Sequence, residues 1–282
     1  MKRILFIGGG KMMQAIAGGL LARGMGASSL AAVEPDAAAA GALHQLRVEV
    51  LSDAVTAAPR LNEFDTLLLA VKPQVLREAL TPFAGRLSGQ LVISIAAGVR
   101  TAELARWLEG ASANADPTQI VRAMPNTPAL IQAGITGLFA GADVSQLSRD
   151  KAESLLSAVG KTTWFNEESM LDVVTAISGS GPAYVFYFIE ALETAALEMG
   201  FAPEAARQFA LETFRGAALL AATSTDAPAT LRANVTSRRG TTEAAIAAFD
   251  RAALKSLFIG GVRAAAARAT ELGDELSAGP TC

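Results

Sequence analysis

Short apolar runs alternate with segments of helical composition along the first 160 residues. The runs lack the polar alternation of a half-buried strand, so they are typical of strands that are buried on both faces. Such strands, spaced by helices, predict a doubly wound α/β domain built on a parallel sheet. The predicted strands cover residues 3–7, 30–33, 48–51, 66–71, 91–95 and 120–123, with a helix over 12–21.

The pattern changes after residue 165. From Met170 onward Ala, Leu and Glu dominate and β-branched runs are few, which predicts an all-helical segment in which Gly200 ends the first long helix. The predicted helices cover residues 182–199, 203–223, 241–249 and 251–272. We therefore expect two domains, residues 1–160 and residues 161–282. The helical segment is either a compact bundle by itself or half of a bundle that a second copy completes, and the Ala-rich helices favour the second arrangement, an intertwined two-fold dimer.

Composition narrows the class of protein. The chain has 282 residues, of which 51% are hydrophobic and 18% charged, so we expect a folded chain with a large core. The net charge is -3 and Lys and Arg are spread along the chain without a basic cluster, so we expect no nucleic-acid or membrane partner. Prolines and glycines interrupt the longest uncharged stretches, and the apolar run at the N-terminus is too short for a secretory leader. The sequence therefore predicts a cytoplasmic protein.

The scarcity of cysteine and histidine limits the catalytic and metal-binding chemistry open to the chain. Cys282 is the only cysteine and His44 is the only histidine. The single cysteine therefore excludes an internal disulfide, a thiolate metal cluster and a cysteine nucleophile. The single histidine argues against a zinc hydrolase or a catalytic triad, because these sites usually need histidine side chains. We predict no metal site.

A glycine-rich turn joins the first predicted strand to the first predicted helix. Such a turn presents backbone N–H groups and the positive end of a helix to a pyrophosphate. Met13 replaces the third glycine of the usual fingerprint, so an ordinary strand-to-helix turn remains the alternative. We predict that a dinucleotide contacts this turn through Ile7, Gly8, Gly9, Gly10, Lys11 and Met12.

An acidic residue, Glu34, stands at the end of the second predicted strand, and Asp36 follows in the same turn. A carboxylate here accepts hydrogen bonds from the ribose hydroxyls of NAD and repels the additional phosphate of NADP. No arginine follows within the next few residues. We include both acidic residues in the predicted cofactor site and favour NAD on this ground, with a plain polar turn as the alternative.

Two further loops, residues 70–74 and 94–98, follow predicted strands at the edge where open α/β sheets bind ligands. Their small side chains allow a flat nicotinamide ring to lie close to the backbone, although tight packing of strand against helix also explains them. The predicted contacts in these loops are Ala70, Val71, Lys72, Pro73, Ser94, Ala96 and Ala97.

Three stretches, residues 121–128, 178–184 and 234–242, contain more glycine and polar residues than packing requires. The last two precede predicted helices, where hydroxyls and free N–H groups bind a small anion, or where Ser180 and Thr241 or Thr242 simply cap the helix. The segments VRAMPNTPA, AISGSGPAYVF and NVTSRRGTTEAAI, together with the glycine-rich turn, resemble the pyrroline-5-carboxylate reductase family. The resemblance covers essentially the full length of the chain.

This resemblance implies a Rossmann-like N-terminal domain and a helical dimerisation domain, assembled as a homodimer or as a decamer of dimers. It implies hydride transfer from NAD(P)H to 1-pyrroline-5-carboxylate, which gives L-proline in the last step of proline biosynthesis. It also implies that Thr242 is catalytic, next to the ring nitrogen of the substrate, and that Asn234 helps to close the cofactor site. The implied substrate contacts are Glu167, Ser237, Gly240, Thr241 and Thr242.

The chain departs from the family pattern at two positions. Arg239 precedes a single Gly240, where the family often has a pair of glycines. Glu34 stands where members that use NADP commonly have Ser, Asn or Arg. The family thus suggests NADP whereas the acidic side chain favours NAD, and the choice between NADP and NAD stays open.

Rival functions remain. A β-hydroxyacid dehydrogenase shares the domain order but needs a lysine on the first long helix after the linker, and no lysine occurs between Lys161 and Lys255. Another imine reductase is a closer alternative. A non-enzymatic dinucleotide sensor or scaffold would keep the glycine-rich turn but has no need of the hydroxyl-rich loop at residues 237–242.

Overall fold

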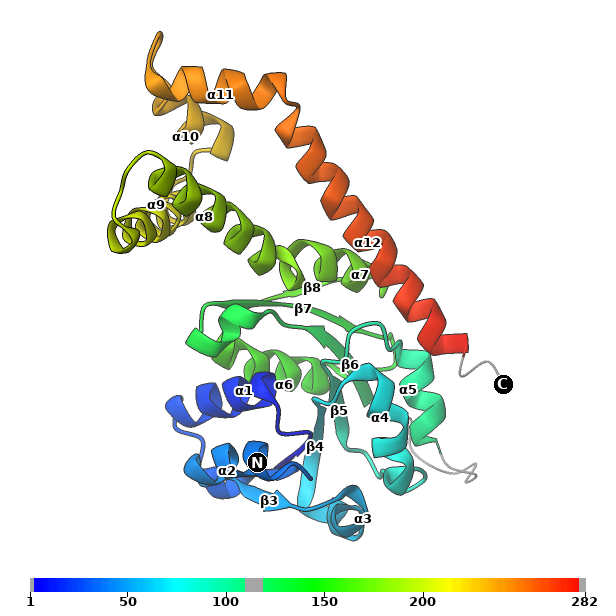
Figure 1. Cartoon of the computed structure of the whole chain (residues 1–282). Helices are drawn as coiled ribbons and strands as arrows, with labels where there is room; N and C mark the ends of the chain where they lie inside the picture. The colour runs from blue at the N-terminus through cyan, green and yellow to red at the C-terminus, as the bar shows by residue number, and fades with distance from the viewer. Residues whose placement is uncertain (1–2, 110–118, 279–282) are drawn as a thin grey trace. The chain divides into compact units, whose positions relative to one another are not determined.

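The computed structural model describes residues 3–109 and 119–278, so Cys282 lies outside the described residues. The chain folds into two compact units (Figure 1), which we call the sheet unit, residues 1–180 with 265–282, and the helical unit, residues 181–264. The sheet unit extends beyond the predicted boundary at residue 160, because a strand that begins at Gly160 is hydrogen-bonded into its sheet. The last helix contributes residues to both units.

The sheet has eight strands in the order β3-β2-β1-β4-β5-β6-β7-β8. The order reverses next to β1, where open α/β sheets bind ligands outside the carboxyl ends of the strands. The first six strands pair in parallel, which confirms the predicted doubly wound α/β domain. They are β1 (Arg3–Ile7), β2 (Leu30–Val33), β3 (Glu49–Leu51), β4 (Phe64–Leu69), β5 (Leu91–Ser94) and β6 (Gln119–Met124).

Two strands were not predicted, β7 (Gly134–Ala140) and β8 (Gly160–Trp164). A short 3-10 segment, Thr127–Ile131, reverses the chain, so that β7 pairs antiparallel with β6, and β8 then adds in parallel to β7. The strand β8 is at the edge of the sheet and alternates between half-buried and exposed residues, so it lacks the apolar run that marks the other strands.

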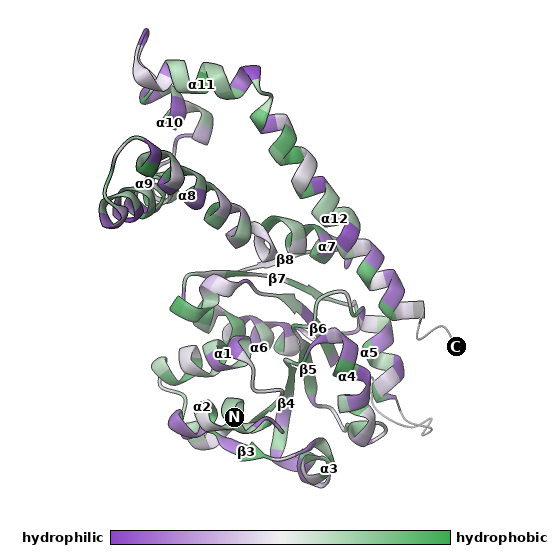
Figure 2. Cartoon of the chain, viewed as in Figure 1, coloured by the Kyte–Doolittle hydropathy of each residue, from purple (hydrophilic) through white to green (hydrophobic). Residues whose placement is uncertain are grey.

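The helical unit contains α8 (Gly181–Glu198), α9 (Pro203–Thr223), α10 (Pro228–Asn234), α11 (Thr241–Arg251) and the start of α12 (Leu254–Ala278). The bounds of four of them lie close to the prediction, whereas α10 was not predicted. Within residues 181–264, all of which are described, only Ala206 and Ala210 are fully buried. Apolar and polar positions alternate around these helices (Figure 2), and several large apolar side chains are at least half exposed, namely Phe186, Tyr187, Phe209, Leu219, Leu220, Phe249 and Leu257.

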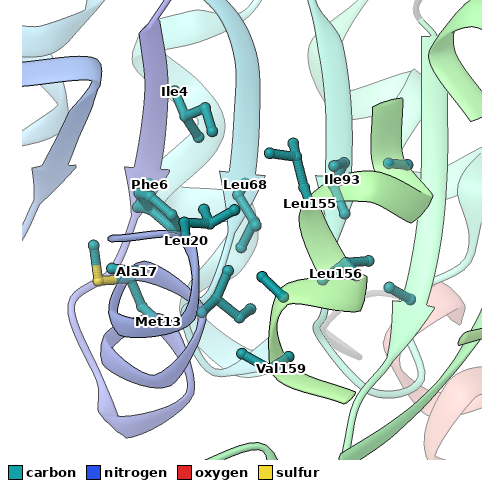
Figure 3. Packing of buried hydrophobic residues seen from close by; sticks show 14 of the residues in the cluster. Ile4, Phe6, Met13, Ala17, Leu20, Leu68, Ile93, Leu155, Leu156 and Val159 are labelled. Atoms are coloured by element: carbon teal, nitrogen blue, oxygen red, sulfur yellow. The ribbon is translucent and has the colours of Figure 1, made fainter. Parts of the chain in front are cut away.

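Side chains on both faces of the sheet are buried, and Figure 3 shows the cluster on one of these faces. On β1, Ile4 and Phe6 pack toward α1 (Lys11–Ala22) and α6 (Gln146–Leu156), because successive strand residues point to opposite faces. Leu5 and Ile7 pack on the other face. The helices that cover the second face are α3 (Ala54–Ala57), α4 (Pro73–Leu80) and α5 (Thr101–Leu108). Around the first six strands, these two layers cover the faces of the sheet and leave the loops at the strand ends open to ligands.

Among the described residues, no helix combines the length and the apolar character that crossing a bilayer requires. Two short elements precede α8 within the sheet unit, α7 (Met170–Val174) and a π-helical turn over Thr175–Gly179. They connect the edge of the sheet to the helical unit in sequence.

A network of two arginines and two glutamates ties the amino end of β1 to β3 and to the segment before β4. Arg3 pairs with Glu49 and Glu63, and Arg60 pairs with both carboxylates at 2.7 Å. Hydrogen bonds from Arg60, and then from Arg3, lower the pKa of Glu49. The network is partly exposed, so its contribution to stability is modest.

We expect Glu49→Gln to lower the melting temperature by about 2 °C at pH 7. A carboxylate whose pKa is lowered by folding stabilises the protein above its unfolded pKa, and this contribution is lost as the pH falls. The difference between wild type and variant should therefore shrink between pH 7 and about pH 4, measured by thermal melts across that range. Glu78→Gln, at an exposed carboxylate on α4, is the control. A difference that grows toward acid pH would contradict this account.

Candidate active site

The glycine-rich turn brings the carboxyl ends of three strands together. The Gly8 N–H donates to Val33 O at 2.9 Å, and the Ala70 N–H donates to Ile7 O at 2.8 Å. Gly8 has a φ of +100°, and a Cβ there would lie 2.7 Å from Val71 Cγ1. Only glycine fits this position, because both the backbone conformation and the loop after β4 exclude a side chain. The predicted contacts at residues 7–8 and 70–71 are thus neighbours.

The N-terminus of α1 has the features of an anion site. Gly10 is the N-cap residue, no side chain caps the helix, and the first turn carries no acidic residue. No heavy atom lies within 4 Å of the place that a Gly10 Cβ would take. The amides of the first turn and the positive end of the helix are therefore open to a phosphate, as a dinucleotide requires.

The residue that breaks the usual glycine fingerprint has a place in the core. Met13 is fully buried against the sheet (Figure 3), among the side chains between α1 and β1. Lys11 is exposed and Met12 is half-buried at the open end of the helix. The incomplete fingerprint therefore reflects helix packing and leaves the phosphate-facing part of the turn intact.

Glu34 lies against the glycine-rich turn. Its Oε2 accepts the Gly9 N–H at 2.6 Å and its Oε1 accepts the Asp36 N–H at 2.8 Å. Asp36 in turn accepts the Ala39 N–H at 2.8 Å and caps α2 (Ala37–Gln45). Asp36 thus acts as a helix cap, which is the role of a plain polar turn residue. Glu34 places a negative charge beside the turn predicted to hold the dinucleotide. A cofactor contact of either residue stays a prediction.

A second group of predicted residues meets beneath α12. A cavity of about 350 Å³ is lined by Pro73 and Gln74 at the start of α4, by Ala97 and Gly98 after β5, and by four residues of α12 together with Thr175. Ser94 is buried at the end of β5, and its Oγ accepts the Ala96 N–H at 3.3 Å. Lys72 is the N-cap residue of α4 and is exposed. The ends of β4 and β5 therefore border one hollow.

Four of the five predicted substrate residues, Ser237, Gly240, Thr241 and Thr242, lie at or just before the start of α11, in the helical unit. The N-cap residue is Gly240, whose N–H donates to Ser237 O at 3.0 Å, and no side chain caps the helix. Thr241 and Thr242 are the first two residues of α11, which excludes their predicted alternative role as N-cap residues. Their hydroxyls and the amides of the first turn can therefore bind a carboxylate. Asn234 is the last residue of α10.

Arg239 adopts a left-handed conformation with a φ of +56°. This conformation is costly for a residue other than glycine, by about 1 kcal/mol, which gives a physical reason for a glycine here in the family pattern. In this chain, Glu243 accepts the Arg239 N–H at 2.6 Å and holds the loop. The turn before α11 therefore forms in this chain with an arginine in place of the glycine.

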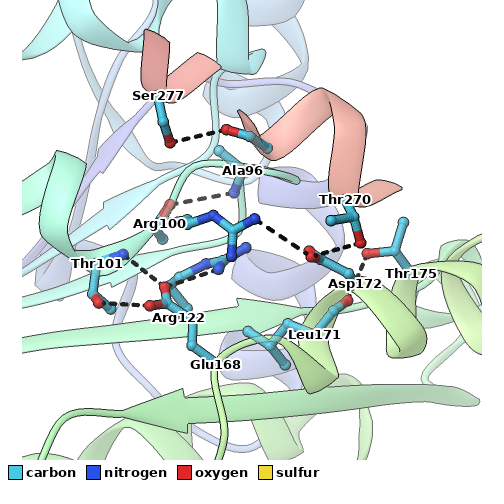
Figure 4. Close-up of polar contacts among 12 residues, drawn as sticks. Ala96, Arg100, Thr101, Arg122, Glu168, Leu171, Asp172, Thr175, Thr270 and Ser277 are labelled. Carbon is cyan, nitrogen blue, oxygen red and sulfur yellow. Dashed lines mark hydrogen bonds and ion pairs between the residues drawn. The ribbon is translucent and has the colours of Figure 1, made fainter. Parts of the chain in front are cut away.

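A buried polar cluster was missed by the sequence reading (Figure 4). Glu167, the predicted substrate contact, is exposed. Its neighbour Glu168 instead accepts hydrogen bonds from Arg122 on β6 at 2.8 Å and from the Thr101 N–H at 2.7 Å. The only sequence signal was one arginine within an otherwise apolar strand. Within residues 3–109 and 119–278, no group of three His, Cys, Asp or Glu side chains could hold a metal ion.

Two family models match the chain. Residues 168–272 match the model for pyrroline-5-carboxylate reductase dimerisation, and residues 3–98 match the model for NADP oxidoreductase coenzyme F420-dependent. The first of these models covers the whole helical unit, and the second covers the glycine-rich turn through β5.

Full-length relatives agree with these models. A pyrroline-5-carboxylate reductase of Pseudomonas aeruginosa is 40% identical over 278 residues, covering 97% of this chain and 98% of its own. One from Haemophilus influenzae is 41% identical, covering 88% and 89%. Among solved structures, a pyrroline-5-carboxylate reductase from Coxiella burnetii superimposes with a TM-score of 0.85 at 38% identity, covering 96% and 98%. The NADP-bound enzyme of Plasmodium falciparum has a TM-score of 0.82 at 25% identity, covering 96% and 98%.

Proposed function

The chain belongs to the pyrroline-5-carboxylate reductase family, and we propose that it reduces 1-pyrroline-5-carboxylate to L-proline with a reduced nicotinamide dinucleotide. The observation that carries the proposal is the likeness to reductases of this name along nearly the whole chain, through both the sheet unit and the helical unit. The uncapped start of α11, with two threonines in its first turn, supplies the chemistry to bind a small carboxylate.

The sheet unit supplies the residues for the dinucleotide. Residues 7–12 hold the pyrophosphate at the open N-terminus of α1, and Glu34 lies on the adenosine side. Residues 70–73 and 94–97 border the nicotinamide, and Asn234 of the helical unit helps to close the site. When bound, the reduced nicotinamide supplies the hydride.

The helical unit supplies the residues for the substrate. A cyclic imine protonated on nitrogen is already electrophilic, so the protein has to hold and orient it rather than supply a strong acid. The hydroxyls of Ser237 and Thr241 bind the carboxylate. Gly240, where a Cβ would lie 2.5 Å from Ser237 Oγ, leaves room for this contact. The Thr242 hydroxyl accepts a hydrogen bond from the protonated ring nitrogen and so fixes the ring. The exposed Glu167 remains a weaker substrate contact.

We expect the absorbance of NADH or NADPH to fall when 1-pyrroline-5-carboxylate is added to the purified protein, with L-proline as product. The same protein should not reduce NAD or NADP with 3-hydroxy acids. Reduction with a 3-hydroxy acid would instead support the β-hydroxyacid dehydrogenase, and no turnover with either substrate would support a dinucleotide sensor.

We expect Thr242→Ala to lower kcat by about tenfold or more, because the ring nitrogen loses its hydrogen-bond partner. Affinity for the reduced dinucleotide should stay nearly unchanged, measured by quenching of its fluorescence. Thr230→Ala, at an exposed threonine of α10, is the matched control and should leave both values as in the wild type. Wild-type turnover in Thr242→Ala would remove this residue from the mechanism.

We propose that the protein prefers NADH to NADPH. The support is the carboxylate of Glu34, which is fixed next to the glycine-rich turn by two backbone N–H groups. A negative charge there accepts hydrogen bonds from ribose hydroxyls and repels a 2′-phosphate.

We expect Glu34→Gln, which removes the charge but keeps the length of the side chain, to raise affinity for NADPH relative to NADH by about tenfold. The measurement is the pair of dissociation constants for each protein, with Glu78→Gln as the control for a lost surface charge. The proposed preference fails if the wild type already binds NADPH about tenfold more tightly than NADH.

We also propose that two copies associate through their helical units, as a homodimer or as the building block of a decamer, in the cytoplasm. The match to a dimerisation model and the many exposed apolar side chains of residues 181–264 support this assembly. A unit with so little buried of its own needs a second apolar surface to cover it.

A further inference from the structure

The helix α5 begins directly after the loop of residues 95–100, which follows β5 and carries the proposed nicotinamide contacts Ala96 and Ala97. Its N-cap residue, Arg100, provides no side-chain cap. The cap comes from Glu168, 67 residues further along the chain. The Glu168 carboxylate accepts the Thr101 N–H at 2.7 Å and the Thr101 hydroxyl at 3.0 Å (Figure 4). A carboxylate at this place satisfies a free amide and complements the positive end of the helix.

Glu168 is itself held by Arg122. The two side chains pair at 2.8 Å, and that of Arg122 is only 5% exposed. Arg122 lies on β6 directly opposite Ser94 of β5, the residue at which the loop begins. An unpaired charge buried this deeply is strongly unfavourable, so Arg122 fixes the position of the glutamate. One ion pair therefore connects the start of the loop to its end.

The rest of the loop is fixed as well. The Ser94 hydroxyl accepts the Ala96 N–H at 3.3 Å. Gly98 has a φ of +78°, and a Cβ there would lie 3.2 Å from Leu276 of α12. Arg100 extends toward α12 and binds Asp274 at 3.0 Å. The loop that borders the cavity beneath α12 is therefore fixed at both of its ends and by its contacts with α12.

We propose that Arg122 and Glu168 are positioning residues for the nicotinamide end of the cofactor. They touch neither cofactor nor substrate, and they act by fixing where the loop of residues 95–100 lies. The proposal rests on the proposed placement of the nicotinamide at Ala96 and Ala97. A displacement of reacting groups by about 1 Å is enough to slow a reaction strongly, so a loosened loop affects hydride transfer first.

A different result is expected if the ion pair of Arg122 and Glu168 only stabilises the sheet unit. Loss of a purely stabilising ion pair lowers the melting temperature, and it weakens the binding of all parts of the dinucleotide equally or not at all. Loss of a positioning pair weakens the nicotinamide half alone, because the adenosine and pyrophosphate contacts lie at the glycine-rich turn. The two ligands that separate these cases are NADH and ADP-ribose, which lacks the nicotinamide.

We expect Glu168→Gln to weaken NADH binding by about fivefold and to change ADP-ribose binding by less than about twofold, measured by calorimetry. Turnover with 1-pyrroline-5-carboxylate should fall by about tenfold. The matched control is Asp65→Asn, which breaks the 2.6 Å ion pair with Lys151 at the amino end of β4. It should lower the melting temperature without changing the ratio of the two affinities. An unchanged ratio in Glu168→Gln, or an equal loss for both ligands, would overturn the proposal.

Thr101→Val is the second variant if Glu168→Gln does not fold. It removes one hydroxyl donor and keeps the ion pair, so we expect the same change in the NADH to ADP-ribose ratio at about twofold. An unchanged ratio there decides against the proposal. The binding ratio is measured without substrate, so a wild-type protein that binds NADH but does not reduce 1-pyrroline-5-carboxylate defeats the proposed function and leaves this test intact.

Discussion

Burial of both faces of the sheet is the constraint on which the rest of the structure depends. Ile4 and Phe6 of β1 pack on one face, and Leu5 and Ile7 pack on the other. With helices over both layers, polar backbone groups remain free only at the ends of strands and helices. The cofactor contacts proposed for the sheet unit therefore lie in the loops after β1, β2, β4 and β5, at one edge of the sheet.

Two glutamates organise this edge in the same way. Glu34 accepts the Gly9 N–H of the glycine-rich turn, and Glu168 accepts the Thr101 N–H at the start of α5. Each carboxylate accepts a backbone N–H that lies in a turn or in the first turn of a helix. The first carboxylate faces the turn proposed to hold the dinucleotide, whereas the second acts through the loop that follows β5.

The helical unit differs from the sheet unit in how few residues it buries. Its helices bury only two residues fully within residues 181–264, and the proposed substrate residues lie at the start of one of them, α11. The family model that covers residues 168–272 is named for dimerisation, in agreement with the exposed apolar side chains.

The sequence alone determined the first six strands, the long helices and the glycine-rich turn, because apolar runs, helical spacing and glycines act within a few residues of each other. It also indicated the family, through motifs that are contiguous in the chain. Only the tertiary structure decided the rest. The strand β8 has no apolar run because it is an edge strand, and α10 is too short to show a clear period. Glu168 rather than Glu167 makes the buried contacts, because its partners Thr101 and Arg122 are distant in sequence and meet it only through the sheet.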